Sequence, residues 1–83
     1  MPLREQLSFF IAERLLQNRD AVVDPDESLL ERGVVDSVGL LNLITFLESE
    51  AGIRVPDDQI IPENFESVVA MEALVAMLRG ARG

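Results

Sequence analysis

Residues 33–41 read Gly-Val-Val-Asp-Ser-Val-Gly-Leu-Leu, and within this stretch an irregular connector gives way to the most regular apolar helix of the chain. Asp36 is suited to be the N-cap of that helix, because its carboxylate can accept hydrogen bonds from the free amides of the first turn and faces the positive end of the helix dipole. Ser37 is then the first helical residue. We predict Ser37 as the functional residue, although an Asp-Ser pair taken alone is also an ordinary helix start.

The helix that begins at Ser37 has two apolar strips. One falls within a sector of roughly 100° and is predicted to face the core; it consists of Leu40, Leu43, Ile44, Leu47 and Ala51. Val38, Leu41 and Thr45 form a second strip on the side of Ser37. Two interpretations of Val38 and Leu41 stay open, a docking surface for a partner or core residues beneath the connector. Gly52 is expected to end the helix as a left-handed cap.

Upstream, apolar residues at steps of three and four predict a helix from about Leu3 to Asn18. Its core face carries Leu3, Leu7, Phe10, Ile11 and Leu15. Phe9, Ala12 and Leu16 lie on the other half of this helix. Either the connector folds over these three residues, or they form an exposed patch for a partner.

The segment from Asn18 to Val35 is rich in turn formers and is predicted to be a long connector. A connector of this length in a small domain is usually pinned down or functional. Its apolar residues are expected to close one end of the helical bundle; they are Leu29, Leu30, Val34 and Val35. The acids near Asp24 resemble the start of a calcium loop, but Leu29 and Val35 stand where such a loop needs Gly and Glu. We therefore reject a calcium site.

The C-terminal half continues the helical pattern. Residues 53–61 predict a short extended segment and a turn, and Pro62 fits the first position of a one-turn helix anchored by Phe65. Ser67 is expected to cap a last helix, and residues 80–83 are expected to fray. That helix presents one apolar face, made of Val68, Met71, Leu74, Val75 and Leu78. Phe46 lies off the main strip of its own helix and is expected to fill a gap beneath a neighbouring element.

Composition sets limits on the function. A chain of 83 residues can hold one domain, predicted to span residues 1–83 as an all-α four-helix bundle. It contains no Cys, His, Lys, Trp or Tyr. Without Cys and His the common zinc sites cannot be built, and without His, Cys and Lys the usual bases and covalent nucleophiles are missing. We expect no self-contained active site and no resident metal.

Charge and targeting signals narrow the partners. Seven arginines against fifteen acids give a formal net charge of -8, which disfavours nucleic acid and anionic membranes and attracts basic protein surfaces. The N-terminal residues do not have the pattern of a secretory signal, and no stretch approaches the roughly 20 apolar residues of a membrane span. The expected location is the cytoplasm.

With these motifs in hand, the sequence resembles the acyl and peptidyl carrier proteins. Asp36-Ser37, preceded by Gly33 and followed by an apolar residue and a Leu-rich helix, is similar to their attachment motif. The resemblance covers nearly the whole chain and extends to the freestanding carriers, including those for amino acids. It continues through Phe46-Leu47-Glu48, Gly52-Ile53, Val55-Pro56-Asp57-Asp58, Pro62-Glu63-Asn64-Phe65 and Ser67-Val68.

The resemblance implies a covalent cofactor. A phosphopantetheinyl transferase, using magnesium and coenzyme A, would attach 4'-phosphopantetheine to Ser37 through a phosphodiester. The thiol of this arm would hold cargo as a thioester and carry it from an adenylating or acyl-loading ligase to a downstream transferase or synthase. The composition agrees, because the chain has no thiol of its own and a cofactor would bring the reactive group. The carrier would act as a monomer.

The family also suggests roles for the neighbouring residues. Asp36 would contact the transferase and its metal. Val38, Leu41 and Thr45 would form the apolar part of the docking surface, with Glu48 as a charged rim. Cargo, where it is sequestered, would lie between the helices, among Leu43, Leu47, Phe65 and Met71.

The sequence departs from the fatty-acid carriers, which usually have Leu and then an acid after the serine, and often glutamate at the position of Asn42. Here these positions hold Val38, Gly39 and Asn42. A smaller, dedicated set of partners is therefore expected, and Gly39 implies a first turn that is either loose or closely approached. The cargo stays open among an amino acid, a fatty acyl chain and a polyketide intermediate, with an amino acid or small acyl group favoured. The alternative function is an unmodified acidic helical module that binds a basic or apolar groove.

Overall fold

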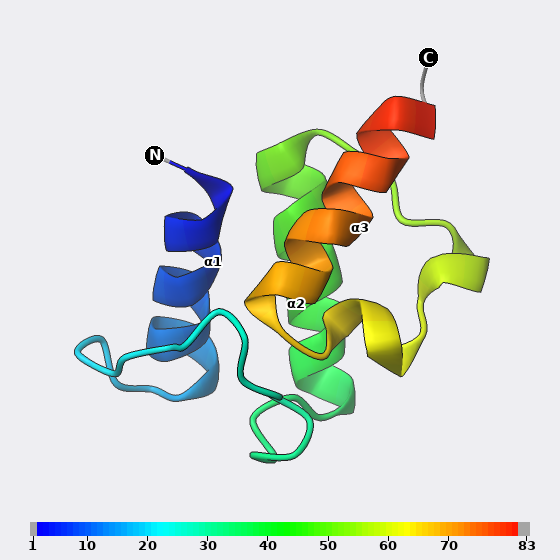
Figure 1. Cartoon of the computed structure of the whole chain (residues 1–83). Helices are drawn as coiled ribbons and strands as arrows, with labels where there is room; N and C mark the ends of the chain where they lie inside the picture. Colours follow the sequence, from blue (N-terminus) through cyan, green and yellow to red (C-terminus); the bar gives the residue numbers. More distant parts are fainter. Residues whose placement is uncertain (1, 82–83) are drawn as a thin grey trace.

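Helices make up all the regular structure of residues 2–81, which are the residues that the computed structural model describes (Figure 1). The elements in chain order are α1 (Leu3–Phe10), η1 (Ile11–Leu15), α2 (Ser37–Ala51), η2 (Asp57–Gln59), η3 (Pro62–Phe65) and α3 (Val68–Ala81). η1 is π-helical and continues α1, whereas η2 and η3 are short 3₁₀ turns. The predicted all-α fold, with three longer helices and a one-turn helix before the last, is confirmed.

The first helix is shorter than predicted. It ends at Leu15 rather than Asn18, because its last turn widens to π geometry, with the N–H of Leu16 donating to the carbonyl of Ile11 over 2.9 Å. Gln17 then adopts a left-handed conformation with φ 53°, which turns the chain away from the helix axis. Gln17 and Asn18 have side chains that a helix tolerates, so residue pattern alone did not locate this end.

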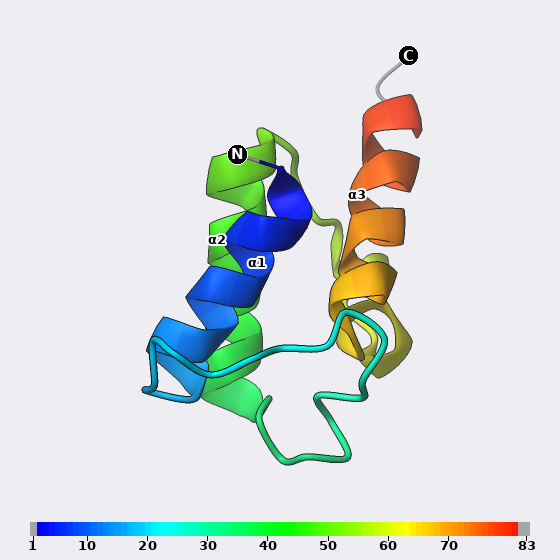
Figure 2. The ribbon, with the colours of Figure 1, turned by 60° about the vertical axis from the view of Figure 1, so that its left-hand side comes forward.

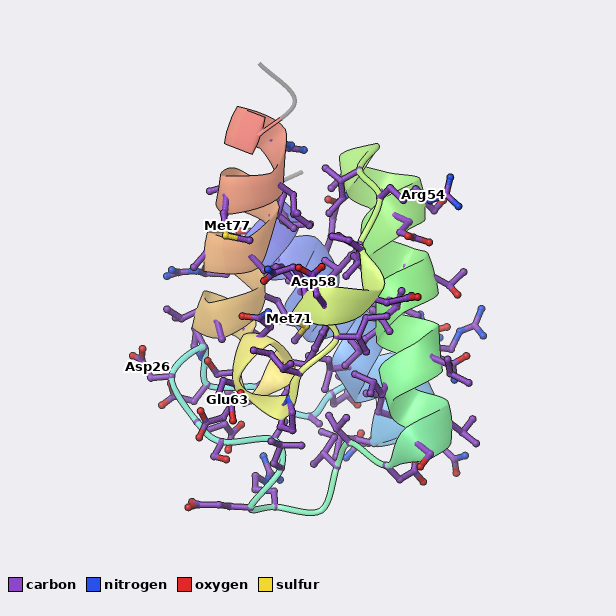
Figure 3. The ribbon with its side chains drawn as sticks, turned by 90° about the vertical axis from the view of Figure 1, so that its right-hand side faces the viewer. Asp26, Arg54, Asp58, Glu63, Met71 and Met77 are labelled. Atoms are coloured by element: carbon purple, nitrogen blue, oxygen red, sulfur yellow. The ribbon has the colours of Figure 1, made fainter. Side chains whose placement is uncertain are left out.

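One hydrophobic core joins all three α-helices. The predicted core residues of α2 are buried, except that Leu40 is half-buried, and the predicted apolar face of α3 is buried throughout. Met71 of α3 is fully buried and lies between α3 and the rest of the bundle in Figure 3. Phe65 anchors η3 in the core and is likewise fully buried, as predicted. These faces bury the apolar surface that stabilises a chain with no disulfide.

α1 packs beside α2, as Figure 2 shows. The rings of Phe10 and Phe46 stack across this seam, with their centroids 4.4 Å apart and their planes at 28°. Phe46 therefore fills the gap beneath a neighbouring element, as expected. The outer half of the first helix is only partly covered: Ala12 is buried and Leu16 half-buried, but Phe9 is 51% exposed.

The connector between η1 and α2 is tied to the start of α3. The N–H of Leu29 donates to the carbonyl of Glu66 over 2.7 Å, and the N–H of Val69 donates to the carbonyl of Pro25 over 3.0 Å. Leu29 is fully buried, so it closes one end of the bundle as predicted, whereas Leu30 is 38% exposed. These contacts hold an otherwise irregular segment in one place beneath the helices.

The acidic side chains of the connector bind its own backbone. Asp24 accepts from the N–H of Asp26 over 2.9 Å, and Glu27 accepts from the N–H of Asp24 over 3.1 Å and pairs with Arg32. Figure 3 shows Asp26 at the surface of this loop. Over residues 2–81, no group of three or more His, Cys, Asp or Glu side chains is placed to hold a metal ion.

The helix ends of the C-terminal half agree with those predicted from the sequence, with one exception. Gly52 caps α2 with φ 65°, and the hydroxyl of Ser67 caps α3 by accepting from the N–H of Ala70 over 3.0 Å. α3 continues through Gly80 to Ala81, so the predicted fraying at those two residues is wrong, because one glycine weakens a helix without ending it. Arg82 and Gly83 lie outside the described residues. No helix within the described part combines the length and the apolarity that crossing a bilayer requires.

Candidate functional site

Ser37 opens α2, directly after a residue that caps the helix. Asp36 has an extended backbone (φ -110°, ψ -170°), and its Oδ1 accepts a hydrogen bond from the N–H of Gly39 over 2.7 Å. The carbonyl of Asp36 accepts the first helical bond, from the N–H of Leu40 over 2.8 Å. The predicted N-cap is thus confirmed. Ser37 is exposed, and its hydroxyl is held at the positive end of the helix dipole.

The connector makes a tight turn shortly before Ser37. The N–H of Gly33 donates to the carbonyl of Leu30 over 3.1 Å, and the N–H of Val34 donates to the carbonyl of Leu29 over 3.0 Å. Gly33 has φ 70°, a conformation that side chains with a Cβ rarely adopt. Because Leu29 is fixed in the core, this turn fixes where Ser37 begins α2.

Gly39 is buried because other segments of the same chain approach it closely. A Cβ at this position would lie 3.2 Å from Oδ1 of Asp36 and 3.4 Å from Cδ2 of Leu15. Of the two expectations for this glycine, the close approach is the one observed. A larger side chain here would require a small shift of the carboxylate of Asp36 or of Leu15.

An apolar groove of about 320 Å³ begins at Ser37. We call it the Ser37 groove; it is lined by Leu30, Val35, Asp36, Ser37, Leu40, Ile60, Pro62 and Phe65. Asp36 is its one ionisable residue, and apart from Asp36 and Ser37 the lining side chains are apolar. The groove can hold a flexible group that is attached to the serine oxygen and makes apolar contacts.

The four residues proposed to surround a sequestered cargo are placed differently from one another. Leu43, Leu47, Phe65 and Met71 are all fully buried. Phe65 lines the Ser37 groove, whereas the other three do not. The groove instead uses Leu30, Val35 and Ile60, which sequence reasoning did not assign to the site. Their one signal was the presence of large apolar residues in segments without helical periodicity.

The second apolar strip of α2 points into solvent. Val38 and Leu41 are 65% and 64% exposed, and Thr45 is exposed as well. The interpretation of Val38 and Leu41 as core residues beneath the connector is therefore excluded. The strip starts one residue after Ser37, so a surface that approaches the serine hydroxyl also meets these side chains.

Glu48, predicted as the charged rim of the docking surface, also makes a structural contact. It is half-buried, and its Oε2 accepts a hydrogen bond from the N–H of Val55 over 2.9 Å. This bond ties the segment after α2 back to the helix and satisfies the amide of a buried residue. Glu48 thus has a structural contact that its position in the sequence did not reveal.

Proteins of similar sequence include carrier proteins. A probable acyl carrier protein, PigG, of Serratia sp. is 32% identical over 77 residues, which cover 93% of this chain and 88% of the relative. Aminoacyl carrier protein 2 of Bradyrhizobium diazoefficiens is 38% identical over 55 residues, which cover 66% of this chain and 61% of the relative. No protein-family model matches the sequence.

Two solved structures have the same fold. One is a chain in a crystal structure of an FAD-dependent dehydrogenase, with a TM-score of 0.72 and 34% identity over 83% of this chain and 97% of that one. The other belongs to a Bradyrhizobium japonicum glycine:[carrier protein] ligase complexed with glycylated carrier protein. Its TM-score is 0.67, with 31% identity over 88% of this chain and 99% of the matched chain.

Proposed function

Because this chain belongs to the acyl and aminoacyl carrier protein family and is a carrier rather than an enzyme, we propose that Ser37 is the residue that bears its 4'-phosphopantetheine arm. The observation that carries the proposal is the placement of Ser37. Its exposed hydroxyl stands at the first residue of α2 and opens onto the Ser37 groove. The chain has no thiol of its own, so a carrier of thioesters must obtain one from a cofactor.

The residues around Ser37 suit such a group. The N-terminus of α2 favours the negative charge of a phosphodiester on the serine oxygen. Asp36 supplies a carboxylate next to Ser37, but this carboxylate is bonded to the N–H of Gly39, and the first turn of α2 itself carries no acidic residue. The Ser37 groove provides apolar contact through Leu40, Ile60 and Phe65. When attached, the arm supplies a terminal thiol that holds the cargo as a thioester.

Asp36 has two roles in this proposal. Its Oδ1 is engaged with the N–H of Gly39 and so keeps Ser37 at the first position of α2. Its exposed carboxylate is also available to the magnesium ion of an approaching phosphopantetheinyl transferase. The cap fixes the hydroxyl, and the charge recruits the metal with which the transferase works.

The exposed strip of Val38, Leu41 and Thr45 is proposed as the docking surface for partner enzymes. Large exposed apolar residues next to a reactive group are typical of interaction sites. The net charge of -8 favours partners with basic surfaces. Partners of this chain would be a phosphopantetheinyl transferase, a loading ligase and a downstream transferase or synthase. The solved ligase complex of a similar carrier supports the ligase in particular.

The cargo is proposed to be an amino acid or another small acyl group. Leu43, Leu47 and Met71 fill the interior between the helices and are fully buried, so a long acyl chain would have to displace packed side chains. The similar chains include aminoacyl carrier proteins and a glycylated carrier. The helices share one hydrophobic core, and we treat residues 1–83 as one carrier domain.

Mass spectrometry tests the assignment of Ser37. The purified protein, incubated with a broad-specificity phosphopantetheinyl transferase, magnesium and coenzyme A, should gain the mass of one phosphopantetheinyl group. Ser37→Ala should gain none, and Ser49→Ala, a change at another exposed serine of α2, should be modified like the wild type. Absence of modification in the wild type would favour the alternative, an unmodified acidic helical module. Modification of Ser37→Ala would place the arm on another residue.

A further inference from the structure

We propose that the seam between α1 and α2 is a second docking site, on which a partner enzyme seats an aromatic side chain flanked by basic residues. This inference rests on the carrier function proposed above and adds a contact that the exposed strip of α2 does not provide. It rests on a groove that has no role in the proposed attachment of the phosphopantetheine arm.

Two adjoining hollows, of about 370 and 280 Å³, lie along this seam. Both are lined by Phe10, Arg14, Phe46 and Glu50, so they form one continuous depression. We call it the aromatic groove. The stacked rings of Phe10 and Phe46 lie between the two hollows and are lining residues of each.

Phe9 is the feature that separates this groove from an ordinary helix seam. It lines the larger hollow and is 51% exposed, although the connector could have covered it. Three of the four phenylalanines of the chain thus meet at one exposed site, with Phe65 in the core. Aromatic clusters of this kind bury large areas on binding and prefer offset or edge-to-face contact with another ring. The groove therefore favours an aromatic side chain over a polar one.

The charges around the aromatic groove favour a basic partner. Its rim holds the carboxylates of Glu13 and Glu50 against the one guanidinium of Arg14. Glu50 makes only a long contact of 3.4 Å, with Nε2 of Gln6, and the structure gives Glu13 no ion pair within residues 2–81. A basic residue can pair with these acids and also lie against the aromatic faces. The net charge of -8 adds a field of the same sign.

The aromatic groove is continuous with the docking strip beside Ser37. Thr45 belongs to the strip and also lines the smaller hollow. Asn42 lines the smaller hollow and a further depression that includes Asp36 and Val38. A partner that faces Ser37 and covers the strip can therefore reach the aromatic groove without leaving the surface of α2. The groove gives such a partner an anchor distant from the serine, which would help to orient it.

A peptide tests the groove directly. The probe is the blocked tripeptide Arg-Trp-Arg, titrated into isotopically labelled protein and followed by NMR. We expect saturable shifts of the ring signals of Phe9, Phe10 and Phe46. Phe9→Ala should raise the Kd at least tenfold, and Glu13→Arg should also weaken binding without altering the apolar lining. Val22→Ala, at an exposed connector residue, is the matched control and should leave the Kd unchanged.

The control peptides and outcomes decide the occupant. Glu-Trp-Glu and Arg-Ala-Arg should each bind at least tenfold more weakly than Arg-Trp-Arg. Non-saturable shifts, or equal Kd values for wild type and Phe9→Ala, would overturn the proposal. Ring shifts on dilution of the protein alone would show a second copy as the occupant and overturn it as well. The titration is repeated on Ser37→Ala. Peptide binding to the aromatic groove is thereby tested independently of the assignment of Ser37 as the attachment site.

Discussion

The carboxylate of Asp36 accepts a hydrogen bond from the N–H of Gly39 over 2.7 Å, and this contact caps the first turn of α2, which begins at Ser37. A Cβ at Gly39 would lie 3.2 Å from Oδ1 of Asp36, so a larger residue there would require a small shift of this carboxylate. The residue before the proposed attachment site is thus part of the structure that positions the site.

Asp36→Ala should lower the free energy of unfolding by about 1 kcal/mol, because the first turn of α2 loses its cap. Asp36→Asn should keep most of the stability, since an amide oxygen is also a good cap. Urea unfolding followed by circular dichroism measures both changes. If Asp36→Asn retains stability but is modified more slowly by the transferase, the charge acts in recruitment; equal modification rates would contradict the proposed metal contact.

Glu48→Ala should destabilise the protein by about 1–3 kcal/mol, because the buried N–H of Val55 loses its acceptor. Glu48→Gln retains an acceptor oxygen and should be closer to the wild type. The urea midpoints of the two variants provide the comparison. A Glu48→Ala variant as stable as the wild type would show that the contact with Val55 contributes little.

Val38→Ser should reduce the efficiency of phosphopantetheinylation roughly fivefold, because docking would lose on the order of 1 kcal/mol of apolar contact. The side chain is 65% exposed, so stability should change by less than about 0.5 kcal/mol. Val22→Ser is the matched control, since Val22 is 87% exposed but lies in the connector. Initial rates at limiting carrier concentration give the ratio. Equal losses in both variants would argue against a specific docking strip.

Leu29→Ala should cost about 2–5 kcal/mol, because it leaves a cavity at the one fully buried leucine of the connector. Leu30→Ala, at a residue that is 38% exposed, should cost much less. Hydrogen exchange adds a local measurement: the amide of Val69, bonded to the carbonyl of Pro25, should exchange faster in Leu29→Ala. Unchanged protection at Val69 would show that the connector stays attached to α3 without Leu29.

Much of the fold was accessible from residue periodicity. The buried faces of α2 and α3 were predicted because a helix repeats its contacts every three to four residues, and the caps at Asp36, Gly52 and Ser67 because each offers a specific partner to free backbone groups. The end of the first helix was predicted three residues late. The π turn and the left-handed Gln17 are local backbone conformations, which the periodicity of apolar residues does not indicate.

The sequence by itself determined the helical order of the chain, the position of Ser37 at the start of α2, and the absence of a thiol in the chain, because these follow from local chemistry and from residue types. Only the tertiary structure decided that Leu30, Val35 and Ile60 share a groove with Ser37, and that Phe9 stands exposed beside the stacked pair of Phe10 and Phe46. The physical reason is distance along the chain. Contacts between separate segments depend on how whole helices pack, and no short stretch of residues encodes that packing.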